Sequence, residues 1–132
     1  CFNRGNILYL AGNGGSHDLA NHMEEEFVCK FVIERKALPA ISLKIHSSTA
    51  NDFAYSHVFT RQLQAYAKPL DVFIGFSTSG ESENINDALR YAKDNNIIAI
   101  DFPRRGNTTA EIQVNQLIDM HDICRIVEQS FQ

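Results

Sequence analysis

The stretch DVFIGFSTSGESENINDALRYA (residues 71–92) joins an apolar run to a hydroxyl-rich loop and then to a helical pattern. The apolar run, residues 71–76, is typical of a strand whose two faces are both covered by helices. The helical pattern begins at Asn84, directly after the loop. A buried strand that leads through a short loop into a helix is the repeating unit of an α/β fold. The loop carries four hydroxyl side chains, those of Ser77, Thr78, Ser79 and Ser82.

The alternation of strand and helix continues along the whole chain. The predicted strands are short and apolar, and they span residues 6–11, 40–44, 71–76 and 97–101. The predicted helices span residues 18–31, 54–66, 84–94 and 109–131. The sequence therefore predicts one α/β domain with a mostly parallel central sheet flanked by helices. Ligands bind such sheets at the carboxyl ends of the strands, which here lead into residues 12–16 and 77–82.

Composition narrows the class of protein and its compartment. The net charge of the 132 residues is −4 and no basic block occurs, so charge does not suggest nucleic acid as a partner. No apolar run approaches the length of a membrane span. The three cysteines are far apart and form no CxxC pair, which favours reduced thiols in a cytoplasmic protein. The first residues are typical of the end of a helix stopped by Gly5, so we expect a further helix before them.

The four hydroxyls of residues 77–82 lie where a strand ends and a helix begins. Backbone N–H groups at a helix N-terminus are unpaired and favour a bound anion. Hydroxyls add donors without adding charge, and Gly80 lets the backbone approach a ligand closely. The alternative is an N-cap, but a cap uses one hydroxyl. We therefore expect a phosphate site, and the lack of a P-loop lysine favours a phosphorylated small molecule over a nucleotide.

The glycine loop GNGGS (residues 12–16) follows the first predicted strand. It lacks the spacing of the GxGxxG fingerprint, and the second strand ends in Lys44 rather than in an acidic residue, so nicotinamide binding is disfavoured. A tight turn would explain one or two of the glycines. Three glycines and Asn13 suggest in addition a ligand pressed against the backbone.

His22 and Glu26 are four residues apart and share one face of the predicted helix. This spacing suits two ligands of one metal ion, or a base beside an orienting group. The alternative is a solvated charged face, and on spacing alone Glu25 is an equally valid partner of His22.

Gln113 and His121 lie on the last predicted helix, eight residues and therefore about 80° apart, so one broad face can hold both. Leu117 and Cys124 share that face, which is therefore partly buried. A polar group on a buried face needs a partner. The alternative to a functional site is a core histidine with a satisfied hydrogen bond.

Together these motifs resemble the phosphoheptose isomerase family of the sugar isomerase (SIS) superfamily, through nearly the whole chain. The family acts on sedoheptulose 7-phosphate. The resemblance implies a single SIS domain over residues 1–132 with a three-layer fold. Two segments, residues 45–50 and 102–107, are shorter than the family usually has, and we expect residues missing there; Val114 stands where the family commonly has Glu. The matching motifs are Gly12 to His17, His22 with Glu26, Asn51 to Phe53, Ser77 to Gly80 with Ser82, and Thr109 to Gln113 with His121.

The resemblance also implies functions for the matched positions. The sugar phosphate would be held by Ser77, Thr78, Ser79 and Ser82. The sugar would be lined by Asn13, Gly14, Gly15, Ser16, Asn51 and Asp52, with Glu26 and Gln113. One zinc ion per subunit would be bound by His22, Glu26, Gln113 and His121. The family's active sites lie between the subunits of a homotetramer, and the heptose product serves lipopolysaccharide or capsule synthesis.

The implied reaction is an aldose–ketose isomerisation through an enediol. Glu26 can serve as the base for a carbon-bound proton, and His121 as the acid at oxygen. A metal could polarise the carbonyl. The alternatives are a non-catalytic SIS protein that binds the replication initiator, and another sugar-phosphate isomerase or sensor. A binding module has no physical need to keep the full polar set of the two helices.

Overall fold

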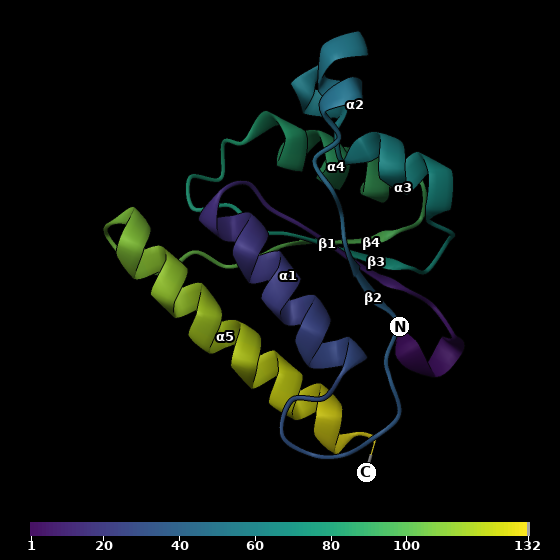
Figure 1. Cartoon of the computed structure of the whole chain (residues 1–132), viewed down its shortest axis with the longest axis vertical. Helices are drawn as coiled ribbons and strands as arrows, with labels where there is room; N and C mark the ends of the chain where they lie inside the picture. The colour runs from purple at the N-terminus through teal and green to yellow at the C-terminus, as the bar shows by residue number, and fades with distance from the viewer. Residues whose placement is uncertain (132) are drawn as a thin grey trace.

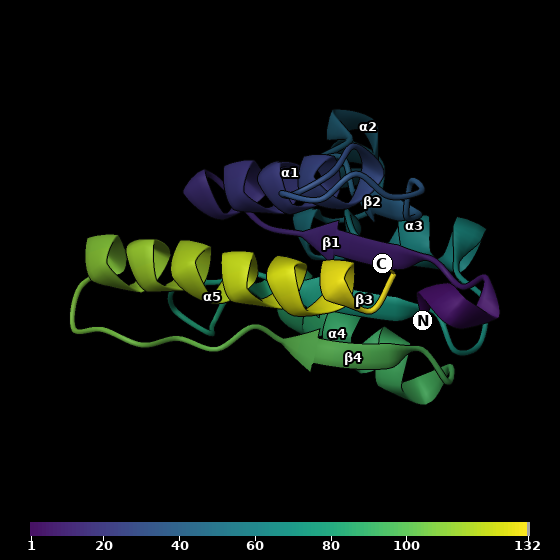
Figure 2. The ribbon, with the colours of Figure 1, turned by 90° about the horizontal axis from the view of Figure 1, so that it is seen from below.

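Four parallel strands form the centre of the structure, a computed structural model that describes residues 1–131. In the sheet they follow the order β2-β1-β3-β4, and Figure 2 shows them one above the other in this order. All neighbouring strands are parallel, which confirms the predicted sheet. The strands are β1 (Leu8–Ala11), β2 (Ala40–Ser42), β3 (Val72–Gly75) and β4 (Ile98–Asp101).

Helices cover both faces of the sheet, so the predicted three-layer arrangement is confirmed (Figure 1). Alternate strand residues face opposite helices, as the pleat requires. Leu10 and Ile74 pack with α1 (Gly15–Val28) and α5 (Thr109–Gln129) in one core cluster. Tyr9 and Phe73 pack with the helices on the other face in a second cluster. These are α3 (Thr60–Tyr66) and α4 (Glu83–Asp94).

The prediction of one continuous helix over residues 54–66 is wrong. The segment between β2 and α3 contains α2 (Ser47–Asp52) and a 3-10 turn, η2 (Tyr55–His57), before α3 begins at Thr60. Side-chain contacts with other elements hold this segment: the Tyr55 hydroxyl donates to Asn13 and the Thr60 hydroxyl donates to Asp87. Such contacts override the helical spacing of the apolar residues. A second 3-10 turn, η1 (Phe2–Arg4), precedes β1.

The two edge strands are less completely covered by helices than their apolar sequences indicate. Ile98 and Ile100 of β4 are 44% and 38% exposed, and Ile41 of β2 is 41% exposed. Within residues 1–131, the helices cover the two central strands more completely than the edges. An exposed apolar strip therefore remains along β4.

The topology sets the positions of the two predicted ligand loops. Ala11 and Gly75, the last residues of β1 and β3, are paired across the sheet, so the glycine loop and the hydroxyl loop begin side by side. The helices α1 and α5 lie next to each other and run in the same direction away from these loops (Figure 1). None of the helices among the described residues has both the length and the apolar character needed to cross a membrane.

Candidate active site

The glycine loop and the hydroxyl loop are joined by a reciprocal amide pair. The Nδ2 group of Asn13 donates to Oδ1 of Asn84, and Nδ2 of Asn84 donates to Oδ1 of Asn13, both at 2.8 Å. The Tyr55 hydroxyl also donates to Oδ1 of Asn13 at 2.9 Å. Asn84 is fully buried and was not among the site residues predicted from the sequence. Its position four residues before Ala88, on the apolar face of α4, was the available signal.

Three of the four hydroxyls in residues 77–82 converge. The Oγ atom of Ser77 lies 3.4 Å from Oγ of Ser79 and 3.4 Å from Oγ of Ser82. Two of these oxygens accept backbone N–H groups of the same loop, Ser77 from Gly80 and Ser79 from Glu81. The loop is thereby folded around its own hydroxyls. Thr78, the fourth hydroxyl residue of the loop, is half-buried.

Ser82 occupies the N-cap position of α4, which was the alternative explanation for the hydroxyl loop. Within the described residues its side chain makes no capping hydrogen bond, and its backbone oxygen accepts the N–H of Asn86. The hydroxyl of Ser82 points instead to the Ser77 hydroxyl. The cluster of hydroxyls is therefore more than a helix cap.

Arg104, a residue that the sequence analysis missed, brings a positive charge to the hydroxyl loop. A Cβ on Gly80 would lie 2.9 Å from the Arg104 guanidinium carbon, so the guanidinium rests against the backbone at this glycine. Gly80 also has φ +73°, a conformation that other residues adopt at a cost. Both carboxylate oxygens of Asp101 accept hydrogen bonds from Arg104, at 2.7 and 2.9 Å.

The start of α5 contacts both loops. The buried amide of Gln116 donates to the backbone oxygens of Ser77 and Pro103, both at 3.2 Å. Gln113, one turn earlier, lies against Gly15, where a Cβ would overlap the Gln113 amide nitrogen. A side chain at position 15 would therefore displace the Gln113 amide from this position.

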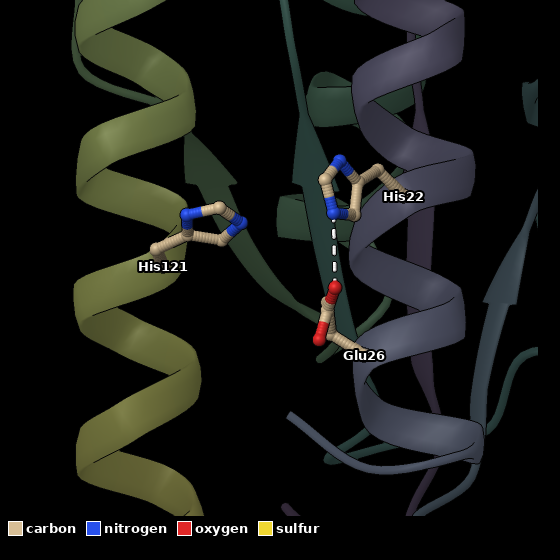
Figure 3. A group of neighbouring side chains, drawn as sticks. All are labelled: His22, Glu26 and His121. Atoms are coloured by element: carbon tan, nitrogen blue, oxygen red, sulfur yellow. Dashed lines mark hydrogen bonds and ion pairs between the residues drawn. The ribbon is translucent and has the colours of Figure 1, made fainter. Parts of the chain in front are cut away.

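Figure 3 shows the three side chains that meet between α1 and α5. Nε2 of His22 lies 2.9 Å from Oε1 of Glu26, and the rings of His22 and His121 lie 5.2 Å apart between centroids. One ligand atom from each of the three lies within 4.8 Å of the others. Glu26, and not the exposed Glu25, is the partner of His22. All three residues come from one chain.

The surroundings of His121 argue against the alternative of a buried core histidine. His121 is half-buried and its ring faces His22 (Figure 3). The Phe31 ring lies 5.2 Å from the His121 ring on another side.

Cys124 follows His121 by three residues on α5. Burial, together with the nearby carboxylates of Glu26 and Glu128, raises the pKa of the Cys124 thiol to about 12, so Cys124 stays a neutral thiol near pH 7.

The donor set of this cluster fits a zinc ion. Two imidazoles and one carboxylate are a known protein ligand set for catalytic zinc, with a further position left open. Ligand atoms within 4.8 Å of one another need only small side-chain adjustments to reach a common ion. Gln113 lies two turns before His121 and its amide packs against Gly15, so its assignment as a fourth ligand stays a prediction.

A shallow groove between α1 and α5 joins the glycine loop to the cluster. Gly15 and His22 mark its two ends on α1, about 10 Å apart along the helix axis. The groove is lined by Gly15, Asp18, Leu19, His22, Gln113, Val114 and Leu117. A long polar ligand anchored at the loops could reach the cluster along this groove.

Three of the residues predicted to line the sugar lie outside the groove between α1 and α5. Asn51 and Asp52 are exposed on α2, and the hydrogen bond found for them within residues 1–131 joins their own side chains. Ser16 is buried in the first turn of α1. Their contact with a sugar stays a prediction.

Comparisons with known proteins identify the family of this chain. A family model described as SIS domain matches residues 1–102. A phosphoheptose isomerase from Clostridium acetobutylicum is 39% identical over an alignment that covers 95% of this chain and 74% of that protein. A phosphoheptose isomerase from Synechocystis is 40% identical and covers 96% and 76%.

The chain belongs to the phosphoheptose isomerase family. The resemblance found in the sequence motifs is thereby confirmed. A solved phosphoheptose isomerase from Francisella tularensis superimposes with a TM-score of 0.89 at 28% identity, over 98% of this chain and 80% of that one. The alignments to the two curated family members above span 145 and 147 positions, more than the 132 residues here, so those relatives contain segments that this chain lacks.

Proposed function

We propose that this protein is an aldose–ketose isomerase that converts sedoheptulose 7-phosphate into a heptose 7-phosphate through an enediol. Its membership of the phosphoheptose isomerase family supports this substrate. The observation that carries the proposal is the meeting of His22, Glu26 and His121 near one end of a groove whose other end is Gly15 of the glycine loop, which begins beside the hydroxyl loop.

The phosphate is proposed to bind at the hydroxyl loop. The convergent hydroxyls of Ser77, Ser79 and Ser82 can donate to phosphate oxygens, and the N-terminus of α4 lies directly after them. Arg104 adds a guanidinium beside the loop. In a 7-phosphate the reacting carbons, C1 and C2, lie at the far end of the sugar from the phosphate. The groove along α1 and α5 offers this separation.

Glu26 and His121 are proposed as the acid–base pair. Starting from the ketose, the Glu26 carboxylate removes a proton from C1 and His121 donates a proton to the carbonyl oxygen on C2, which gives the enediol. The hydroxyl on C1 then loses its proton to His121, and Glu26 returns a proton to C2. His22 orients the Glu26 carboxylate through their 2.9 Å contact.

A zinc ion, if bound, would be held by His22, Glu26 and His121, and it would polarise the substrate carbonyl and stabilise negative charge on oxygen. The protein residues retain the tasks of binding the phosphate, orienting the sugar and moving protons. Glu26 would both bind the zinc ion and move protons.

The quaternary structure is proposed to be a homotetramer with active sites close to subunit boundaries, in the cytoplasm. Exposed apolar side chains on α5 and β4 support association between subunits, since large apolar patches on a soluble surface commonly mark interfaces. They are Val114, Ile118, Ile126, Ile98 and Ile100. The cysteines are free thiols, which agrees with a reducing compartment.

The test is isomerisation of sedoheptulose 7-phosphate in D2O, followed by NMR. In an enediol route the proton that Glu26 takes from C1 exchanges with solvent while the enediol is bound, so solvent deuterium appears at C2 of the aldose product. The expected result is deuterated heptose 7-phosphate with no turnover of hexose 6-phosphates. Binding of the sugar phosphate without any turnover would support the non-catalytic alternative, and turnover of a hexose phosphate alone would support another isomerase.

A further inference from the structure

A buried ion pair that the proposed mechanism does not use lies beside the cluster. Arg35 is in the loop between α1 and β2, and Glu128 is in the last turn of α5. Their side chains are 1% and 2% exposed, and Arg35 Nε lies 3.4 Å from Glu128 Oε1. Burying two charges is costly, and a buried pair is weak support for a purely stabilising role. The hydrogen bonds of Arg35 and of Glu128 show which parts of the backbone the pair holds in place.

Glu128 fixes the loop onto the end of α5. Its carboxylate accepts three successive backbone N–H groups, from Phe31 at 2.9 Å and from Val32 and Ile33 at 2.8 Å. Hydrogen bonds from several N–H groups to one carboxylate are strong and directional. The backbone of Phe31 is therefore attached to α5 seven residues beyond His121.

Arg35 closes the end of α1. Its guanidinium donates to the backbone oxygen of Glu26 at 2.6 Å and to that of Phe27 at 2.8 Å. A positive charge at a helix C-terminus interacts favourably with the unpaired carbonyls there. Arg35 thus contacts the backbone of Glu26 itself, while its partner Glu128 belongs to the helix of His121.

Phe31 connects this pair to the second acid–base residue. Its N–H is bound by Glu128, and its ring lies 5.2 Å from the His121 ring. A shift of residues 31–33 would therefore move the ring that packs on His121.

We propose that Arg35 and Glu128 are positioning residues, which set the alignment of Glu26 on α1 with His121 on α5 through the loop that carries Phe31. The role in turnover rests on the proposed function. A displacement of about 1 Å at reacting groups can lower a rate about a hundredfold, so a tie this close to both groups matters beyond stability.

The test compares Glu128→Gln with a matched control, Asp71→Asn. Asp71 is also a buried carboxylate that accepts backbone N–H groups, from Ile7 and Lys68, but it precedes β3 at the opposite end of the sheet from the two loops. Both substitutions keep the shape of the side chain and remove a buried charge. Both should lower the temperature of unfolding.

Two readouts separate positioning from stability. Glu128→Gln should lower kcat by about ten- to hundredfold and leave KM and the inhibition constant of inorganic phosphate unchanged, whereas Asp71→Asn should keep kcat. In protein with 13C-labelled histidine and no substrate, the His121 ring resonance should shift in Glu128→Gln and stay in place in Asp71→Asn. The NMR readout is independent of turnover, so it decides the inference even if wild-type protein fails to isomerise the heptose phosphate.

An unchanged His121 resonance and an unchanged kcat in a folded Glu128→Gln protein would overturn the proposal. If that variant does not fold, Arg35→Lys takes its place, because it keeps the positive charge beside Glu128 but cannot reproduce the guanidinium contacts with the Glu26 and Phe27 carbonyls. A shifted His121 resonance with lower kcat in Arg35→Lys supports the proposal. Wild-type values for both would overturn it.

Discussion

The side-chain amides of Asn13 and Asn84 exchange two hydrogen bonds of 2.8 Å and thereby join the loop after β1 to the helix after β3. Asn13 is next to the glycines, and Asn84 begins the helix that follows the hydroxyl loop. The pair therefore couples the two loops that are proposed to hold one substrate. Its removal should affect stability and binding together.

Asn84→Ala should lower the free energy of unfolding by about 1–3 kcal/mol, because it leaves the amide of Asn13 without its partner. It should also weaken inorganic phosphate binding. The control is Asn95→Ala, which removes an exposed amide that donates to the Tyr91 carbonyl at the other end of α4. Urea unfolding and calorimetric titration measure the two effects. Equal losses of unfolding free energy and of phosphate affinity in the two variants would argue against coupling between the loops.

Ser79→Ala should weaken inorganic phosphate binding by about 0.5–1.5 kcal/mol, the contribution of one neutral hydrogen bond. Ser79 is exposed, so the fold should tolerate the change. Ser48→Ala, on the exposed surface of α2, is the control. Calorimetry with phosphate measures both. Unchanged affinity in Ser79→Ala and in the double variant with Ser77→Ala would remove the phosphate site from this loop.

Cys124 should not react with a thiol reagent at pH 8, whereas the exposed Cys29 should react quickly. Burial raises the Cys124 pKa to about 12, so thiolate forms there only near that pH. Mass spectrometry after alkylation of the folded protein distinguishes the two. Rapid labelling of Cys124 would show that the space between α1 and α5 is open to solvent.

Glu128 should stabilise the fold least at low pH. Burial alone opposes its ionisation, but hydrogen bonds from Ile33, Val32 and Phe31 and the charge of Arg35 outweigh burial and lower its pKa. A lowered pKa stabilises the folded state above the unfolded value of about 4.3, and this contribution is lost as pH falls through the folded pKa.

The measurement is urea unfolding of wild type and Glu128→Gln between pH 3 and pH 7. The difference in unfolding free energy should be about 3 kcal/mol near pH 7 and should shrink below about pH 4. A difference that stays constant with pH would contradict the assignment of an ionised Glu128.

Sequence patterns predicted the parts of this structure that depend on local spacing. The four strands, α4 and α5 follow from apolar runs and helical periodicity, and the contact of His22 with Glu26 follows from a separation of four residues. The shape of the segment 47–59 did not follow, because Tyr55 within it and Thr60 directly after it form hydrogen bonds with distant elements.

Contacts between distant elements could be predicted only through resemblance to a family. The meeting of His121 with His22 depends on the packing of α1 beside α5. Asn84 was missed because its partner Asn13 is 71 residues away in sequence. Arg104 was missed because it meets the hydroxyl loop at Gly80, which has no side chain to indicate the contact. Periodicity places a side chain on a face of its own element, but it does not say which element covers that face.

The most direct test of the proposed chemistry is the turnover number of Glu26→Gln for sedoheptulose 7-phosphate, measured beside Glu25→Gln, its exposed neighbour on α1. Glutamine keeps the shape of the side chain and removes its basicity. In Glu26→Gln, kcat should fall by at least about a hundredfold while the affinity for inorganic phosphate stays unchanged, and Glu25→Gln should keep the wild-type kcat. Near-normal turnover in Glu26→Gln would contradict the assignment of Glu26 as the base.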